Sequence, residues 1–244
     1  MVGRRALGPF LKSNPFPHGF SEGLFYREKM RAIHRVAPAV LPQEARILEI
    51  GGGRSGMAAA LYPGARVVTL DIDPSLAGPE DELHTFVCGD ACALPFDDAS
   101  FDVVTLFDVL EHIPDDQAAA REAMRVTRPG GHILVSTPRH DWRYPYYGFM
   151  KRFCPPEKSL MDEWGHVRRG YTDEALVKLF GRNPVTRATF INTGTAFFHD
   201  VAFSLLSPRK RKVLYAAAAL PTAIAYVAHT RSTPGTETAF AWQQ

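Results

Sequence analysis

The chain has 244 residues, and its 28 Lys and Arg against 26 Asp and Glu leave a formal charge of +2. With 22% charged and 45% hydrophobic residues, the composition is globular, which excludes a disordered chain, a collagen-like repeat and a nucleic-acid-binding tail. The three cysteines, Cys88, Cys92 and Cys154, contain no Cys-x-x-Cys pair, which predicts reduced thiols in a cytoplasmic protein.

Short β-branched runs alternate with helical stretches from about residue 44 onward. The runs are continuous and apolar, which is typical of a parallel sheet covered on both faces. The predicted strands are 46–50, 66–70, 84–88, 101–107, 132–136, 185–191 and 236–242. The predicted helices are 22–36, 56–61, 115–126, 172–180 and 208–228. We therefore expect a doubly wound α/β domain over 44–244, preceded by an N-terminal helical cap at 1–43.

Two segments interrupt this alternation, and each predicts an insertion. Residues 139–172 are rich in aromatic and cationic side chains, which suits a substrate lid that stacks on a flat or sugar-like acceptor with polar or anionic groups. Residues 195–230 predict a helical insertion. Within it, 213–228 is an uncharged apolar run behind the basic run 209–212, and it is too short to span a bilayer. Its length favours a buried or lid-forming helix pair; the alternative is an interfacial helix on an anionic membrane.

A glycine-rich turn follows the first predicted strand, in Glu49-Ile50-Gly51-Gly52-Gly53-Arg54-Ser55-Gly56. Its form, E-x-G-x-G-x-x-G between a strand and a helix, lets a ligand lie against main-chain N–H groups. Asp71 ends the next strand, where a carboxylate can accept the hydroxyls of a ribose. A nicotinamide dinucleotide would use the same carboxylate. However, Glu49 would repel its pyrophosphate, whereas it suits a ligand with a positive centre.

Further motifs follow in order: 88–96 (CGDACALPF), 100–104 (SFDVV), 110–112 (LEH) and 125–131 (RVTRPGG). Together with the glycine loop and Asp71, they make residues 44–138 resemble the class I S-adenosylmethionine-dependent methyltransferases. The resemblance implies a Rossmann-like, seven-stranded, mostly parallel sheet whose last strand is antiparallel, with helices on both faces. It puts Glu49, Gly51, Gly53 and Gly56 around the methionine moiety, Asp71 at the ribose, Asp90 and Ala91 at the adenine, and the Phe107 backbone near the methionine amine.

The fourth strand is followed by Asp108-Val109-Leu110-Glu111-His112, whose D-x-x-E-H spacing brings two carboxylates and an imidazole to one face of a helical turn. Such a group could hold Mg²⁺, which would lower the pKa of a bound hydroxyl. The pattern resembles the metal element of Mg²⁺-dependent ubiquinone-pathway O-methyltransferases and of small-RNA 2′-O-methyltransferases, which add a later histidine. The predicted ligands are thus Asp108, Glu111, His112 and His166. The alternative is a metal-free pocket shaped by Glu111 and His112.

Methylation of a hydroxyl needs a general base, and three histidines are candidates: His112, His140 after the fifth strand, and His166. In the helix at 22–36, Tyr26 and Arg27 either close over the cofactor carboxylate or belong to a helix that simply packs on the sheet.

These features predict S-adenosylmethionine-dependent O-methylation of a carbohydrate or other small molecule, with or without the help of Mg²⁺. Bacterial sugar and polysaccharide O-methyltransferases are the nearest functional resemblance. The alternative is methylation of a quinone or lipid-linked acceptor at a membrane surface, which would give 213–228 a purpose. RNA is disfavoured as a substrate, because a charge of +2 with no long basic stripe attracts phosphate weakly. A non-catalytic cofactor-binding subunit is a last alternative, against which the intact glycine loop and the candidate bases argue.

Overall fold

Seven strands form the central sheet of the part of the chain that the structure, a computed structural model, describes: residues 1–16, 22–53, 55–230 and 233–244. The strands are β3 (Arg46–Ile50), β4 (Arg66–Asp71), β5 (His84–Cys88), β6 (Phe101–Phe107), β7 (Thr127–Pro138), β8 (Thr186–Phe190) and β9 (Glu237–Gln243). Their spatial order is β5-β4-β3-β6-β7-β9-β8, and of these seven strands β9 alone runs in the direction opposite to the other six. The expected mostly parallel sheet with an antiparallel last strand is confirmed.

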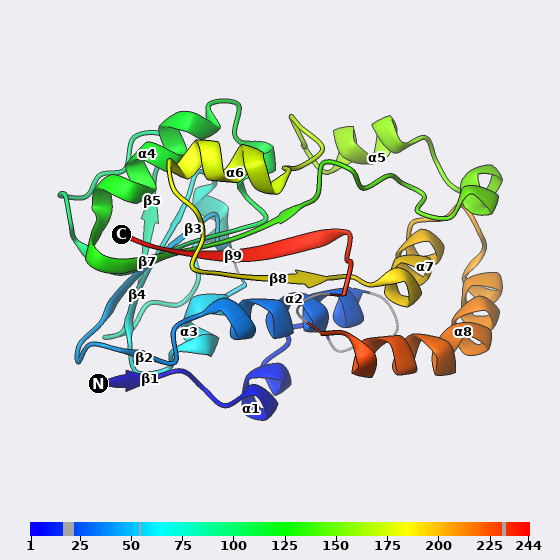
Figure 1. Cartoon of the computed structure of the whole chain (residues 1–244), viewed down its shortest axis with the longest axis horizontal. Helices are drawn as coiled ribbons and strands as arrows, with labels where there is room; N and C mark the ends of the chain where they lie inside the picture. Colours follow the sequence, from blue (N-terminus) through cyan, green and yellow to red (C-terminus); the bar gives the residue numbers. More distant parts are fainter. Residues whose placement is uncertain (17–21, 54, 231–232) are drawn as a thin grey trace.

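Helices cover both faces of this sheet (Figure 1). On one face lie α4 (Asp116–Val126) and α6 (Asp173–Phe180); on the other lie α1 (Leu7–Lys12), α2 (Glu22–Val36) and α3 (Met57–Leu61). Successive strand residues point to opposite faces, so Ile47 packs in the cluster that contains Ile33 of α2, whereas Leu48 packs with Ala123 of α4. The sheet is therefore buried between two apolar layers, as its continuous apolar strands require.

The N-terminal segment packs into the same core as the sheet. β1 (Val2–Gly3) pairs with β2 (Val40–Leu41), and Phe10 of α1 is buried in the cluster that contains Ile33 and Ile47. The predicted cap at 1–43 thus forms part of the layer that covers one face of the sheet.

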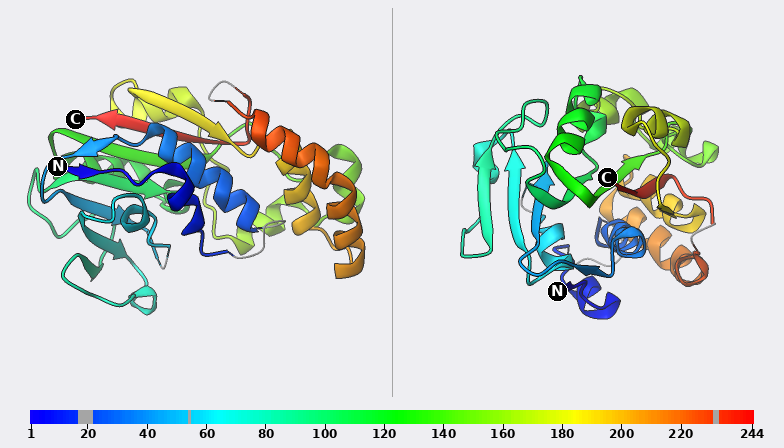
Figure 2. Two further views of the ribbon diagram at one scale, coloured as in Figure 1. Left: turned by 90° about the horizontal axis from the view of Figure 1, so that it is seen from below. Right: turned by 60° about the vertical axis from the view of Figure 1, so that its left-hand side comes forward.

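The two insertions form one end of the molecule (Figures 1 and 2). They comprise η3 (Gly148–Phe153), α5 (Glu157–Glu163), α7 (Thr193–Ala202) and α8 (Pro208–Ala228). Asp200 of α7 joins them, because its buried carboxylate accepts hydrogen bonds from the backbone N–H groups of Tyr146 and Tyr147, both at 2.8 Å. Since α7 directly follows β8, this end lies at the carboxyl ends of the parallel strands. The role of 139–172 as a substrate lid stays a prediction.

The structure of α8 corrects the favoured expectation for 213–228. A single helix with a bend (Figures 1 and 2) stands where a pair was expected, and Thr222 is its only buried residue. Pro221 is tolerated because the N–H that it lacks would have bonded to the Ala217 carbonyl, and both residues lie on the exposed side. Among the described residues, no helix is both long and apolar enough to cross a membrane.

Asn192 ties α7 to α2. Its side-chain oxygen caps α7 by accepting from the backbone N–H groups of Gly194 and Thr195, at 2.9 and 3.2 Å. Its amide nitrogen donates to the buried Glu28 carboxylate of α2 at 2.9 Å. A single buried side chain therefore stabilises both a helix start and a contact between layers.

We expect Asn192→Ala to lower the free energy of unfolding by about 2 kcal/mol, because the cap and the donor to Glu28 are lost together. Thr172→Ala is the matched control: Thr172 caps α6 through a single bond from the Ala175 N–H, so its loss should cost about 1 kcal/mol. Urea unfolding followed by circular dichroism measures both changes. Equal losses for the two variants would contradict the double role of Asn192.

Candidate active site

Two neighbouring cavities lie beyond the carboxyl ends of the parallel strands. The larger, of about 760 Å³, is lined among others by Gly51, Asp71, Leu76, Asp90, Ala91 and Val109. The smaller, of about 160 Å³, is lined by Glu111, Pro138, Trp142, Trp164, His166, His199 and Glu237. Asp108 and His112 line both cavities, so a group bound in one meets a group bound in the other at these two side chains.

The turn after β3 forms one wall of the larger cavity. Gly51 has φ +64°, and its N–H donates to the Leu70 carbonyl at 2.8 Å. A Cβ at this position would lie 2.5 Å from Cγ2 of Val109, so the close approach of the two walls requires glycine. Asp71 and Asp90, at the ends of β4 and β5, reach the same cavity as the sequence predicts.

Three of the predicted cofactor residues, Glu49, Gly53 and Gly56, line a separate cavity of about 260 Å³, although Gly53 also borders the larger cavity: a Cβ on it would lie 3.9 Å from Oδ2 of Asp71. The Glu49 carboxylate is buried and accepts a hydrogen bond from the Ala58 N–H at 3.1 Å. Burial raises the pKa of Glu49 to about 7. In this structure Glu49 therefore holds the start of α3, and its contact with a methionine moiety stays a prediction.

Lys29 of α2, which the sequence analysis missed, reaches Asp108, at the boundary between the 760 Å³ and 160 Å³ cavities. Its Nζ lies 2.7 Å from Oδ2 of Asp108 and 3.5 Å from the Phe107 carbonyl, which the resemblance puts near the methionine amine. Burial opposes the ammonium charge, but the neighbouring Asp108 carboxylate prevails and raises the pKa of Lys29. One signal was present: Lys29 stands three residues after Tyr26 and so shares its helix face.

The two N-terminal candidates from the sequence, Tyr26 and Arg27, lie in different places. The ring of Tyr26 lies beside Lys29, with Nζ 5.8 Å from the ring centre. Arg27 turns away, and its Nε donates to the hydroxyl of Tyr226 in α8 at 3.1 Å. Only Tyr26 of this pair is therefore near the candidate site.

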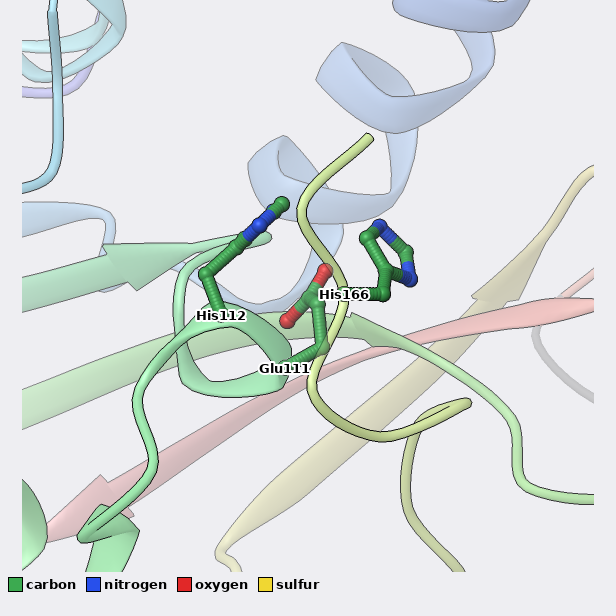
Figure 3. Close-up of side chains that lie close together, drawn as sticks. All are labelled: Glu111, His112 and His166. Atoms are coloured by element: carbon green, nitrogen blue, oxygen red, sulfur yellow. The ribbon is translucent and has the colours of Figure 1, made fainter. Parts of the chain in front are cut away.

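Glu111, His112 and His166 form the titratable cluster of the smaller cavity (Figure 3). The first two come from η2 (Leu110–His112), and the third comes from the segment that passes beside it. Each offers one ligand atom, and these atoms all lie within 4.8 Å of one another. Asp108 is not part of this group, because its carboxylate also accepts a hydrogen bond from the Ser136 hydroxyl at 2.6 Å besides pairing with Lys29.

Main-chain contacts hold the His166 segment against η2. The N–H groups of Val167 and Arg168 donate to the Glu111 carbonyl, at 3.0 and 3.3 Å. Nδ1 of His112 lies 3.2 Å from the Gly165 carbonyl. Since a carbonyl only accepts, this nitrogen carries the proton, and neutral His112 keeps its lone pair on Nε2.

Arg168 fastens the same two segments through its side chain. Its guanidinium donates to the main-chain carbonyls of Leu110, Ile113 and Pro114. Other cations of the insertion are paired as well: Arg139 with Asp141 and Asp173, and Arg169 with Glu157. These three arginines therefore have partners within the protein, and the expected cationic lid over the acceptor stays a prediction.

Burial sets the protonation of the cluster. Burial, aided by the nearby Asp108 carboxylate, raises the pKa of Glu111 to about 8, so this acid is mainly neutral at pH 7. Burial and the adjacent His112 lower the pKa of His166 to about 4. Oε1 of Glu111 and Nδ1 of His166 have no hydrogen-bond partner among the described residues. These two buried polar atoms mark a place where a bound molecule would find partners.

The donor atoms do not suit the Mg²⁺ ion expected from the sequence. Mg²⁺ prefers oxygen ligands, whereas the cluster offers two imidazoles and one carboxylate, and the further expected ligand, Asp108, is held by Lys29. Two histidines with one carboxylate suit a first-row transition metal instead.

His199 was not singled out by the sequence, yet it lies in the wall of the smaller cavity. Burial lowers its pKa to about 4. Five aromatic rings from α2, the first insertion and the end of α7 surround it at 4.8 to 5.9 Å between centres: Phe25, Trp142, Tyr144, Trp164 and Phe203. Glu237, at the start of β9, is the third missed residue, after Lys29 and His199, and burial keeps its pKa well above the usual range.

His140 does not lie at the cluster of Glu111, His112 and His166. Its side chain is exposed, and it lines neither main cavity. Of the three predicted bases, His112 and His166 therefore share the site, and a role for His140 stays a prediction.

Comparisons with known proteins agree with this geometry. Residues 48–135 match the family model described as a methyltransferase domain. The N-methyltransferase NodS from Bradyrhizobium japonicum, in complex with S-adenosyl-L-homocysteine, has a TM-score of 0.55 to this structure, at 15% identity, over 98% of this chain and 96% of that chain. Residues 48–135 therefore carry a methyltransferase domain, and the described chain has the fold of this N-methyltransferase.

Curated relatives share the methyltransferase domain at higher identity. The 2-methyl-6-phytyl-1,4-hydroquinone methyltransferase of Synechocystis is 32% identical over 157 residues, which are 58% of this chain and 48% of the relative. The ubiquinone/menaquinone biosynthesis C-methyltransferase UbiE of Paracoccus denitrificans is 34% identical over 121 residues, 42% of this chain and 48% of the relative. The chain thus spans about half the length of these relatives.

The neutral Glu111 should make stability fall as pH rises. The folded protein holds a proton on Glu111 up to about pH 8, whereas the unfolded chain releases it near 4.5, so the stabilisation is lost between these values. We expect Glu111→Gln, which cannot ionise, to gain a few kcal/mol in unfolding free energy relative to the wild type from about pH 5 to about pH 8.5.

Urea unfolding across this pH range measures the difference. Glu163→Gln, at an exposed position of α5, is the matched control and should keep a constant offset from the wild type. A constant offset for Glu111→Gln would contradict a buried, neutral carboxyl group.

Proposed function

We propose that this protein transfers the methyl group of S-adenosylmethionine to a ring carbon of a quinol- or phenol-type acceptor that carries an apolar tail. The observation that carries the proposal is the meeting of a large and a small cavity at Asp108 and His112. The larger has the size of ordinary cofactor sites. The smaller, at about 160 Å³, is close to the roughly 150 Å³ in which an apolar cavity holds benzene, so it suits a single ring.

The larger cavity suits S-adenosylmethionine, which supplies an electrophilic methyl group when bound. Asp71 would accept the ribose hydroxyls, and Asp90 with Ala91 would contact the adenine. The remaining end of the cavity, at Gly51 and Asp108, is then left for the methionine moiety. This order points the reacting end toward the smaller cavity.

The walls of the smaller cavity favour an aromatic acceptor. Trp142 and Trp164 contribute nearly parallel rings, 6.4 Å apart and inclined by 19°, and flat apolar surfaces of this kind stack on a ring. The relatives from Synechocystis and Paracoccus are named for hydroquinone and quinone acceptors. Both observations support the quinone alternative rather than the carbohydrate that the sequence put first.

His112 is the proposed general base. Nε2 of neutral His112 is free to take the proton of a ring hydroxyl at the boundary of the cavities. Glu111, neutral at pH 7, can donate a hydrogen bond to the resulting oxyanion. The oxyanion enriches the adjacent ring carbon in electrons. That carbon would take the methyl group from the sulfonium, whose sulfur keeps the bonding electron pair and leaves as a thioether. The carbon's own proton would then pass to solvent, which restores the aromatic ring, and protonated His112 would return its proton to the ring oxygen.

Asp71→Ala should weaken S-adenosylmethionine binding by at least about tenfold, because it removes charge-assisted hydrogen bonds to the ribose. Calorimetric titration measures the dissociation constant. Asp97→Ala, at an exposed position outside the cavity, is the matched control and should bind like the wild type. Unchanged affinity in Asp71→Ala would remove the cofactor from this cavity.

Incubation with methyl-labelled S-adenosylmethionine and separate pools of short-tailed hydroquinones, phenols and sugars tests the reaction itself. We expect hydroquinone products labelled on a ring carbon, located by NMR, and activity that survives chelation. His112→Ala should lower turnover by about a hundredfold or more at unchanged cofactor affinity, whereas His140→Ala should not. Labelled sugars without labelled quinols would overturn the acceptor class, and full activity of His112→Ala would overturn the base.

A further inference from the structure

Helix α8 has one face in contact with the rest of the protein. Thr222 donates to the Gly194 carbonyl of α7 at 3.3 Å, and the ring of Tyr215 lies 5.0 Å from that of Phe198. The guanidinium of Arg31, from α2, lies over the ring of Tyr226 at 4.2 Å. These contacts fix which side of the helix is covered.

The opposite face is apolar and uncovered. Val213, Leu220, Ile224 and Val227 are 68%, 70%, 60% and 77% exposed. At roughly 100° per residue, Leu220, Ile224 and Val227 of the second half of the helix fall within an arc of about 60°, on the side away from Thr222 and Tyr226. An uncovered stripe of large side chains along several turns of one helix marks an interaction surface.

The start of the same helix is strongly basic. Arg209, Lys210 and Lys212 are exposed, whereas Arg211 turns inward and donates to the carbonyls of Leu206 and Ala202. No carboxylate occurs anywhere in 201–228. The positive end of the helix dipole lies at the first turn, so cations there destabilise the helix when no anion is bound. The same cations, together with the dipole, attract anions strongly to this place.

Two further exposed apolar side chains belong to segments that lie with α8 at this end of the molecule (Figures 1 and 2). Leu205, just before the helix, is 75% exposed, and its N–H donates to the Phe153 carbonyl at the end of η3. Phe149 of η3 is 63% exposed and rests against Phe197 of α7, with ring centres 6.2 Å apart. Both insertions thus present apolar side chains to the same surroundings.

We propose that α8 docks this end of the protein on the surface of an anionic lipid bilayer. A helix with an apolar stripe and a basic end matches such a surface: the stripe enters the acyl boundary while the cations meet the headgroups. A second copy of the chain fits less well, since 201–228 of the copy supplies no carboxylate for the exposed cations.

Docking would bring the acceptor site to the lipid. His199 lines the smaller cavity and lies on α7, the helix against which α8 packs. A tailed ring could then enter the site while its tail remains among the acyl chains. This last point rests on the proposed function, whereas lipid binding itself does not.

Co-sedimentation of the full chain with phosphatidylcholine vesicles, with and without phosphatidylglycerol, tests the proposal. We expect binding to the anionic vesicles that weakens as salt is raised. Replacing Arg209, Lys210 and Lys212 together by Gln should lower the affinity for these vesicles about a hundredfold, at roughly fivefold per cation. Leu220→Ser with Ile224→Ser should abolish binding.

The matched control is Val40→Ser with Val185→Ser, two apolar side chains that are 51% and 60% exposed elsewhere, and it should bind like the wild type. Thermal unfolding checks that each variant is folded. The α8 variants should keep wild-type turnover of a short-tailed, soluble hydroquinone, so failure of the reaction and failure of docking are read separately. Absence of binding to anionic vesicles would overturn the proposal. So would a dimer in sedimentation velocity that Leu220→Ser with Ile224→Ser dissociates.

Discussion

The ion pair between Lys29 and Asp108 holds the turn on which both cavities depend. Asp108 has φ +55°, a left-handed conformation that a residue with a Cβ adopts only at a cost of roughly 1 kcal/mol or more. Its carboxylate offsets this cost by pairing with Lys29 and by accepting a hydrogen bond from Ser136. The chain can therefore leave β6 abruptly and enter η2, which carries Glu111 and His112. Through Lys29, helix α2 thus helps to fix the positions of Glu111 and His112.

The sheet, and the places of Gly51, Asp71 and Asp90 at its edge, were predictable because their signals are local. Each strand is an apolar run of its own length, and the glycine turn, Asp71 and Asp90 lie at fixed distances from strand ends. The largest error in a strand boundary is at β7, which begins at Thr127 rather than 132. Thr127 pairs with Phe101 across a shift in register near a glycine pair, and a pattern of side chains does not reveal such an irregularity.

The smaller cavity was less predictable because its parts come from distant elements. Lys29, His199 and Glu237 lie on α2, α7 and β9, and nothing near them in sequence marks them as neighbours. Likewise, the number of arginines in a segment does not show which of them can bind a ligand and which donate to main-chain carbonyls, as Arg168 does. The composition of the apolar run in α8 likewise does not show which side of the helix packs on the protein and which side is exposed.

Asp200 has a consequence for how acceptor specificity can change in evolution. This buried carboxylate belongs to the second insertion, but its hydrogen-bond donors, Tyr146 and Tyr147, belong to the first. Exchange of one insertion alone would leave either the acid or the two N–H groups without partners in a buried place. The two insertions therefore form a single inheritable module. A chimera with another methyltransferase would have to import both, while the half of the sheet at β3, β4 and β5 could remain as it is.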